Sequence, residues 1–154
     1  MSDQYNEIVT TFPLFKGLTP QGAGMLLDRG EVRTHASGDV LFREGEAPSF
    51  AMLVLTGRLH VFVEREGRDV VVSEVWPGAL LGELSVLSGL PRSASVRCAE
   101  PSVLAVWDDK AFRRLLLSNV FLSERIFGQA LRVLIDRERA LIDSLLESQA
   151  GQGR

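Results

Sequence analysis

The chain of 154 residues has few of the side chains that form disulfides, metal sites or catalytic centres. Its one cysteine, Cys98, cannot form an internal disulfide, and no cysteine cluster exists for zinc or an iron–sulfur centre. The two histidines, His35 and His60, each lie in a strand-like segment without a serine or cysteine motif beside them. We therefore expect no catalytic residues, no metal and no cofactor, and a role other than that of an enzyme. The single thiol favours a reducing, cytoplasmic location.

The sequence also lacks an excess of basic charge and any long hydrophobic run. Its 17 basic and 20 acidic residues give a formal net charge of -3. This charge disfavours nucleic-acid binding through phosphate neutralisation, although a local basic patch stays open. No apolar run approaches the roughly 18 residues that a membrane span needs, and the acidic N-terminus does not resemble a secretory signal. The hydrophobic content of 45% provides for one core, and the length fits one domain.

A central block of the chain alternates apolar and polar residues, which is the pattern of half-buried strands. Its segments are short, rich in valine, phenylalanine and leucine, and separated by glycine-containing turns. They cover residues 31–36, 39–44, 49–56, 58–65, 69–76, 93–98 and 102–108. Many short strands joined by such turns predict a sandwich or a barrel. A helical segment precedes the block, because Pro20 suits the first turn of a short helix that runs through Leu26 and Leu27.

Beyond the last strand the apolar spacing becomes that of helices. Asp108 or Asp109 can cap a first helix, whose Arg113 and Arg114 face outward. A second, longer helix is predicted from about residue 121 to residue 147. Its apolar stripe comprises Ile126, Phe127, Ala130, Leu131, Val133, Leu134, Leu141, Ile142 and Leu145.

This apolar stripe exceeds what the small core needs, and three partners for it stay open: the chain's own core, a second copy of the chain, or another protein or a membrane. Glu138 interrupts the stripe, and charges of both signs flank it, which argues against a lysine-rich helix that lies on a membrane. We therefore expect a homodimer formed through this helix, and no membrane contact. The small, polar residues 149–154 predict a flexible tail.

Between two predicted strands, the stretch GELSVLSGLPRSASV (82–96) carries one acid and one arginine among small and apolar residues. Glu83 to Ser88 has the composition of one or two helical turns, so backbone N–H groups at Gly82 and Glu83 can attract an anion. Arg92 follows in a proline-led turn, where its guanidinium can make two hydrogen bonds to a phosphate or a carboxylate. Glu83 and Arg92 either form an ion pair that closes the loop or bind one ligand that carries an anionic group and a hydroxyl, such as a sugar phosphate.

The stretch LGELSVLSGLPRSASV resembles the phosphate-binding cassette of cyclic nucleotide-binding domains. Such domains occur in the catabolite activator protein, the regulatory subunits of cyclic-AMP-dependent protein kinase and cyclic nucleotide-gated channels. The matching residues are Gly82, Glu83, Leu84, Pro91, Arg92, Ser93, Ala94 and Val96, with the family's spacing between the acid and the arginine. Gly38, Gly45 and Gly57 agree with turns between the family's strands. The resemblance extends from Phe12 to the end of the long helix.

The resemblance implies an α+β fold, in which an eight-stranded antiparallel β jelly roll carries a short N-terminal helical segment, a short helix in the cassette and C-terminal helices that include one long helix. Within one domain, it implies an N-terminal segment (1–30), the jelly roll (31–108) with the phosphate-binding cassette (81–96), the C-terminal helices (109–148) and the tail (149–154). The C-terminal helices would serve as a lid and as the dimerisation element.

The resemblance also implies the ligand, cyclic AMP or cyclic GMP, and the roles of the cassette residues. Glu83 would accept a hydrogen bond from the ribose 2′-hydroxyl, and Arg92 would pair with the cyclic phosphate. Backbone amides at Gly82, Ser93 and Ala94 would complete the phosphate site. The Ser93 hydroxyl would bond the phosphate or reach guanine, or it is only a small residue in a tight turn. One arginine and these dipoles suffice for a diester with one negative charge, without a metal.

In this family, selection of the base comes partly from the long C-terminal helix, which closes over the pocket like a lid. Spacing from the cassette makes Arg137 and Glu138 candidate base contacts, and solvated charges on a helix face are the alternative. Apolar lining of the pocket is expected from four residues that are as easily ordinary core: Val63, Val72, Leu81 and Leu84. Of these, Val72 and Leu81 are further candidates for contact with the base.

Bacterial transcription factors of this family continue into a helix-turn-helix module that this sequence does not contain, so we expect no direct DNA binding. Three functions stay open. The first is a regulatory sensor in which a bound cyclic nucleotide repositions the C-terminal helix and an unidentified effector protein responds. The second is a ligand-independent dimeric scaffold on the same fold. The third is a Crp/Fnr-type transcriptional regulator that acts through a partner.

Overall fold

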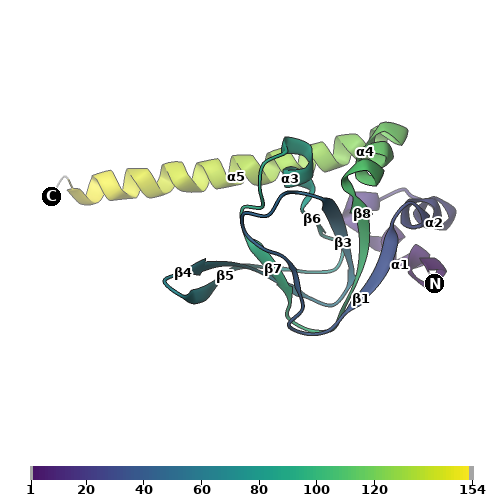
Figure 1. Cartoon of the computed structure of the whole chain (residues 1–154). Helices are drawn as coiled ribbons and strands as arrows, with labels where there is room; N and C mark the ends of the chain where they lie inside the picture. Colours follow the sequence, from purple (N-terminus) through teal and green to yellow (C-terminus); the bar gives the residue numbers. More distant parts are fainter. Residues whose placement is uncertain (1, 153–154) are drawn as a thin grey trace. The chain divides into compact units, whose positions relative to one another are not determined.

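The computed structural model of the chain describes residues 2–152 and divides into two compact units, one up to Ser118 and one from Asn119. The first unit holds two four-stranded antiparallel sheets together with short helices (Figure 1). Its strands are β1 (Glu31–His35), β2 (Val40–Phe42), β3 (Phe50–Thr56), β4 (Leu59–Arg65), β5 (Arg68–Val75), β6 (Leu80–Leu81), β7 (Ser95–Cys98) and β8 (Ser102–Asp108). Its helical segments are η1 (Ser2–Tyr5), α1 (Asn6–Thr11), η2 (Pro13–Phe15), α2 (Pro20–Asp28), α3 (Glu83–Ser88) and α4 (Asp109–Ser118). The second unit holds α5 (Val120–Gln152).

The two sheets have the strand orders β1-β8-β3-β6 and β2-β7-β4-β5, and all the neighbouring pairs are antiparallel. Each segment of alternating residues coincides with or overlaps one of these strands. The prediction of an α+β fold with eight antiparallel strands is thus confirmed for the described part of the chain. The alternation missed β6, because its two residues are too few to show a period. This strand is defined by its pairing with Met52 and Leu53 of β3.

The main core lies between the two sheets and takes side chains from both. Its buried members are Phe42, Met52, Val54, Leu59, Leu81, Val96, Cys98, Leu104 and Val106. The opposite face of β3 is buried as well, since Ala51, Leu53 and Leu55 have no exposed surface. On that side, the indole N–H of Trp107 in β8 donates to the carbonyl of Leu26 in α2 at 3.1 Å. Because both faces of β3 are covered, the sequence of this strand is a nearly continuous apolar run.

Helices α2 and α4 begin where the sequence predicted, at Pro20 and after Asp108. The hydroxyl of Thr19 accepts a hydrogen bond from the N–H of Gly22 at 3.1 Å, and Pro20 occupies the first turn of α2. At the start of α4, Asp108 Oδ1 accepts from the N–H of Ala111 at 2.7 Å. These caps supply acceptors for N–H groups that a first helical turn leaves without intrahelical partners.

Strands β4 and β5 form a hairpin that extends beyond the rest of the first unit (Figure 1). Its turn consists of Glu66 and Gly67, with φ values of 55° and 75°, which are typical of the two-residue turns that match the twist of a hairpin. Strand β5 lies at the edge of its sheet and exposes the consecutive residues Val70, Val71 and Val72. Val72, a candidate base contact, is therefore a surface residue of this unit.

Helix α5 begins with a cap from Asn119, whose Oδ1 accepts a hydrogen bond from the N–H of Leu122 at 3.0 Å. The helix continues through Gln152, whereas the sequence predicted a flexible tail from residue 149. Residues 149–152 can continue it because none of them is a proline, which would remove a backbone donor. The last two residues of that predicted tail lie outside the described residues. Among the helices of residues 2–152, none combines the length and the apolar composition that crossing a membrane requires.

Candidate functional site

Helix α3 lies between β6 and β7 and is bounded by two glycines in the left-handed region, Gly82 with φ 79° and Gly89 with φ 74°. The carbonyl of Gly82 accepts the first helical hydrogen bond, from the N–H of Val86 at 3.2 Å. The short helix that the composition of the stretch predicted is present, and it begins at Glu83.

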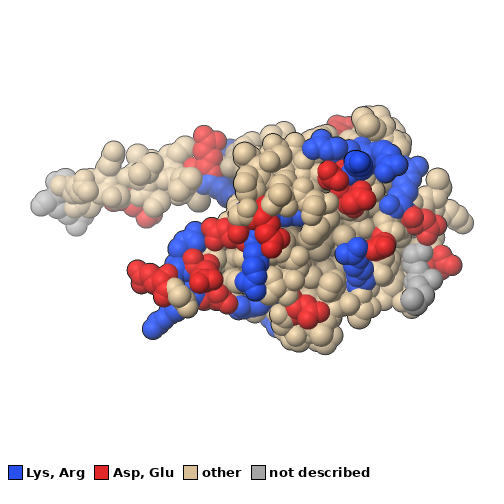
Figure 2. Space-filling view, viewed as in Figure 1, with Lys and Arg blue, Asp and Glu red and all other residues tan. Residues whose placement is uncertain are grey.

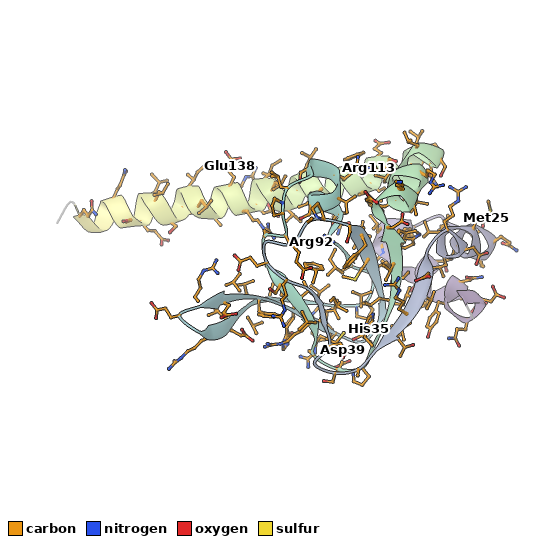
Figure 3. The ribbon with its side chains drawn as sticks, viewed as in Figure 1. Met25, His35, Asp39, Arg92, Arg113 and Glu138 are labelled. Carbon is orange, nitrogen blue, oxygen red and sulfur yellow. The ribbon has the colours of Figure 1, made fainter. Side chains whose placement is uncertain are left out.

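Arg92 is a buried charged residue, with 3% of its surface exposed. Its Nη1 donates to the carbonyl of Gly82 at 2.9 Å, and its Nη2 donates to the carbonyl of Phe50 at 2.6 Å. The guanidinium lies over the rings of Phe42 and Phe50, with 4.2 and 4.9 Å from Cζ to the ring centroids. Figure 3 shows Arg92 within the strand region of the first unit. The arginine is thus held by the start of α3, the start of β3 and two aromatic faces.

Burial lowers the pKa of Arg92 from its ordinary value, because the charged form loses its solvation. The negative charges of Glu46 and Glu83 oppose this shift, and Glu46 has the larger effect. Glu83 therefore lies within electrostatic reach of Arg92. Glu46, from the loop before β3, is an acidic neighbour that the sequence reasoning missed. An arginine in this setting stays charged at neutral pH.

The Nε of Arg92 is buried, and within residues 2–152 it has no hydrogen-bond partner. A buried donor left without an acceptor costs about 1–3 kcal/mol, and more when the donor is charged. An anionic oxygen is the acceptor that best satisfies such a donor, because the hydrogen bond is then charge-assisted at both ends. The residues present thus fit a ligand with one compact negative group.

The loop before β3 holds the backbone of Arg92. Its N–H donates to the carbonyl of Glu46 at 2.9 Å, and its carbonyl accepts from the N–H of Gly45 at 2.8 Å. Nearby, the N–H of Glu44 donates to the hydroxyl of Ser95 at 2.9 Å. These bonds join the loop 43–46 to the turn that carries Arg92, so the arginine enters the core from a fixed backbone position.

Gly82 has no room for a side chain. A Cβ built on it would lie 2.6 Å from Nη1 of Arg92 and 3.1 Å from the carbonyl oxygen of Phe50. Its positive φ is a second reason for glycine, since other residues pay roughly 1–2 kcal/mol there. Gly89 has a similar φ of 74°, yet a Cβ there would meet nothing within 4 Å.

We expect Gly82→Ala to destabilise the fold by about 2–4 kcal/mol, because it adds a clash with Arg92 to the backbone strain. The matched variant Gly89→Ala carries the strain alone and is expected to lose about 1–2 kcal/mol. Urea unfolding of both variants measures the difference. Equal losses of stability in the two variants would show that the close approach of Arg92 to Gly82 does not contribute to the destabilisation.

The remaining cassette residues follow the same local order. Leu84 is half-buried on α3, Ser93 is exposed directly after Arg92, and Ala94 is half-buried before β7. All three residues thus belong to the same stretch of chain as Gly82 and Arg92. Their roles in ligand binding stay predictions.

The candidate base contacts have different surroundings. Leu81 belongs to the core cluster between the sheets, which favours the ordinary-core alternative for this residue. Val72 is exposed on β5. Arg137 and Glu138 lie on α5, in the second unit, and both side chains are exposed; Figure 3 labels Glu138 on this helix.

A cavity of about 300 Å³ in the first unit is lined by Arg29, Gly30, Glu31, Arg33, Ser49, Phe50, Val106, Asp108 and Ala111. Its charged groups have partners within the chain. Arg33 donates to Glu31 Oε2 from Nε at 2.8 Å and from Nη2 at 2.6 Å, and Arg29 donates to the Ser118 hydroxyl at 2.7 Å. Among residues 2–152, there is no group of three or more His, Cys, Asp or Glu side chains that could hold a metal ion. The buried arginine of the cassette is therefore the stronger candidate site.

The family model described as "Cyclic nucleotide-binding domain" matches residues 32–119, which include the whole cassette. A curated cAMP-dependent protein kinase regulatory subunit from Blastocladiella emersonii is 37% identical over 93 residues, which are 60% of this chain and 23% of that relative. The chain thus spans about a quarter of the length of this relative.

Two solved structures extend the comparison. The catabolite activator protein of Thermus thermophilus is 27% identical, with a TM-score of 0.75 over 88% of this chain and 63% of that one. The regulatory domain of Toxoplasma gondii PKA, solved with cAMP, is 25% identical, with a TM-score of 0.62 over 73% of this chain and 43% of that one.

Proposed function

The chain belongs to the cyclic nucleotide-binding domain family, and from this premise we propose that it is a regulatory protein that binds cyclic AMP or cyclic GMP at the α3 cassette. The Toxoplasma relative was solved with cAMP, and the Blastocladiella relative is a cAMP-dependent kinase subunit, which supports the choice of ligand. A role in binding, and not in catalysis, agrees with the family.

The observation that carries the proposal is the buried guanidinium of Arg92, whose Nε has no acceptor among the described residues. A cyclic phosphate diester has one negative charge and exposed equatorial and axial oxygens, so one arginine and backbone N–H groups can hold it. We propose that Arg92 donates to this phosphate and that the backbone amides of Gly82, Ser93 and Ala94 complete the site. Gly82 supports this role, because a side chain there would meet Arg92.

Glu83 is proposed to accept a hydrogen bond from the ribose 2′-hydroxyl. Its position at the first residue of α3, within electrostatic reach of Arg92, supports this assignment. A ligand that bonds both side chains spans the sugar and the phosphate of one nucleotide. Leu84 is proposed as an apolar neighbour of the ligand, and Val72, Arg137 and Glu138 as base contacts, whereas Leu81 is assigned to the core between the sheets.

We expect Glu83→Ala to weaken cyclic AMP binding about 10- to 100-fold, because a charge-assisted hydrogen bond contributes about 1.5–3 kcal/mol. In the wild type, 2′-deoxy cyclic AMP should bind as weakly as cyclic AMP binds to the variant. The variant should not distinguish the two nucleotides, since the hydroxyl and its acceptor form one interaction. Isothermal titration calorimetry measures all four combinations. A variant that still prefers cyclic AMP over the deoxy analogue would contradict the role of Glu83.

The proposed output is a change in the position of the C-terminal helix on ligand binding, sensed by an effector protein. Such a change requires that the ligand interact differently with the two states of the protein. We also infer that the two sheets form a jelly roll at residues 31–108, that the cassette spans 81–96 and that residues 109–148 act as lid and dimerisation element.

A second function, a dimeric scaffold that does not depend on ligand, is favoured by one observation. Helix α5 exposes a series of large apolar side chains, among them Leu131, Leu134, Leu141 and Leu145. These residues suit a homodimer whether or not a nucleotide binds. A ligand-indifferent dimer that binds no cyclic nucleotide would support the scaffold over the sensor.

A further inference from the structure

One hydrogen bond joins the cassette to α4. Nη2 of Arg113, on α4, donates to the carbonyl of Val86, on α3, at 2.6 Å. The sequence predicted that Arg113 faces outward. The residue is indeed exposed at the surface, but its long side chain reaches back to α3. Figure 3 labels Arg113 at α4, and Figure 2 shows basic side chains gathered over this helix, which carries Lys110, Arg113 and Arg114.

The carbonyl of Val86 needs this donor. In a longer helix it would accept from the N–H of Leu90, but α3 ends at Ser88 and the N–H of Leu90 donates to the Ser88 hydroxyl at 3.2 Å. A carbonyl in the last turn of a helix depends on partners outside the helix. The side chain of Val86 is buried, with 2% of its surface exposed, so α3 is fixed to the core at the residue that Arg113 contacts.

A second set of hydrogen bonds joins Arg92 to the start of α4. Nη2 of Arg92 donates to the carbonyl of Phe50 at 2.6 Å. The preceding carbonyl, of Ser49, accepts from the N–H of Asp109, the first residue of α4, at 3.0 Å. Arg92 also holds α3 through the carbonyl of Gly82. Two paths therefore lead from Arg92 to α4, one through β3 and one through α3 and Arg113.

We propose that Arg113 is a positioning residue that links the cassette helix to α4. It fixes the C-terminal end of α3 in the free protein, and it transmits to α4 any shift of α3 that follows when a ligand engages Arg92. This transmission rests on the proposed function, whereas the fixing of α3 does not. In the chain, α4 is followed directly by Asn119 and α5, so this link connects the cassette to the helix that precedes α5.

The neighbouring Arg114 offers a matched control. It carries the same charge on the same helix, but its Nε donates to the carbonyl of Lys110, one turn earlier in α4, at 3.4 Å. Arg114→Ala therefore removes the same charge as Arg113→Ala and leaves the bond to Val86 in place. Arg113→Lys restores a donor and the charge without the planar fork of the guanidinium.

The experiment is hydrogen–deuterium exchange of the full chain, read at the amides of α3 and α4, for the wild type and the three variants. Without nucleotide, Arg113→Ala should speed exchange in α3 by about tenfold, as expected for the loss of one hydrogen bond from a charged donor. Arg114→Ala should leave α3 unchanged, and Arg113→Lys should recover part of the protection. Unchanged exchange in α3 of Arg113→Ala, or an equal increase in Arg114→Ala, would overturn the positioning role.

The second arm adds saturating cyclic AMP, with binding monitored by calorimetry on the same samples. In the wild type and in Arg114→Ala, the nucleotide should change exchange in both α3 and α4. In Arg113→Ala, the nucleotide should still bind and change α3, but the response of α4 should fall by at least half. An undiminished α4 response in Arg113→Ala would overturn the transmission. A wild type that binds neither cyclic AMP nor cyclic GMP would contradict both the proposed function and the transmission. The exchange measurement without nucleotide would still decide whether Arg113 positions α3.

Discussion

Arg92→Ala is expected to raise the dissociation constant for the cyclic nucleotide by at least about 100-fold, because charge-assisted hydrogen bonds contribute about 1.5–3 kcal/mol each and the guanidinium can give two to the phosphate. The effect should be the same for cyclic AMP and cyclic GMP, since both carry the same cyclic diester. Isothermal titration calorimetry of the variant and the wild type measures it.

Arg92→Lys is the control that keeps the charge. A lysine ammonium has three donors and no planar fork, so it cannot reproduce the bonds to Gly82 and Phe50 together with two to a phosphate. We expect an intermediate loss of affinity, about tenfold. Because the buried Arg92 guanidinium also lies over the rings of Phe42 and Phe50, urea unfolding must establish that each variant is folded at the temperature of the titration. A folded Arg92→Ala variant with wild-type affinity would remove Arg92 from the site.

Leu134→Glu is expected to convert a homodimer into a monomer. On α5, Phe127, Leu131, Leu134, Leu141 and Leu145 follow one another at spacings of three, four or seven residues and are 46–66% exposed. This is the spacing of a coiled-coil seam, in which a glutamate would face its counterpart in the partner helix. A buried like-charge pair and the lost leucine contacts should weaken the dimer by several kcal/mol. Analytical ultracentrifugation over a range of concentrations measures the change.

The matched control is Ala140→Glu, which introduces the same charge at an exposed position of α5 outside this series. It should leave the dimer intact. A wild type that is monomeric at high micromolar concentration would contradict dimerisation through α5, and so would a Leu134→Glu variant that stays dimeric. Equal disruption by both variants would point to the charge of the helix and not to the apolar series.

Local patterns of the sequence predicted much of this structure. The alternation from Glu31 to Asp108 located the strands, apart from β6, whose two residues cannot display a period. The composition of residues 83–88 predicted α3, which begins at Glu83. These predictions succeed because they depend on residues close together in the chain.

The surroundings of Arg92 could not be predicted in this way. Phe42 and Phe50 precede it by 50 and 42 residues, and only the pairing of β2 with β7 and of β3 with its neighbours brings them to the guanidinium. One sequence signal does exist for Phe50, since its alternation with Met52 directs it to the same interior. Glu46 and Arg113 have no such signal. The apolar periodicity of the helix predicts that Arg113 lies on the surface, but it does not predict that its flexible side chain donates to the carbonyl of Val86.

A calorimetric titration of the wild-type chain with cyclic AMP, cyclic GMP and noncyclic 5′-AMP decides whether the cassette binds a cyclic nucleotide. A phosphate held by Arg92 and backbone amides, a sugar held by Glu83 and contacts to the base together predict a dissociation constant on the order of 1 μM for at least one cyclic nucleotide. Noncyclic 5′-AMP should bind at least about 100-fold more weakly, because its free phosphate is not fixed beside the 2′-hydroxyl. Absence of binding by both cyclic nucleotides up to submillimolar concentration, or equal binding of 5′-AMP, would contradict the assignment of the cassette as a cyclic nucleotide site.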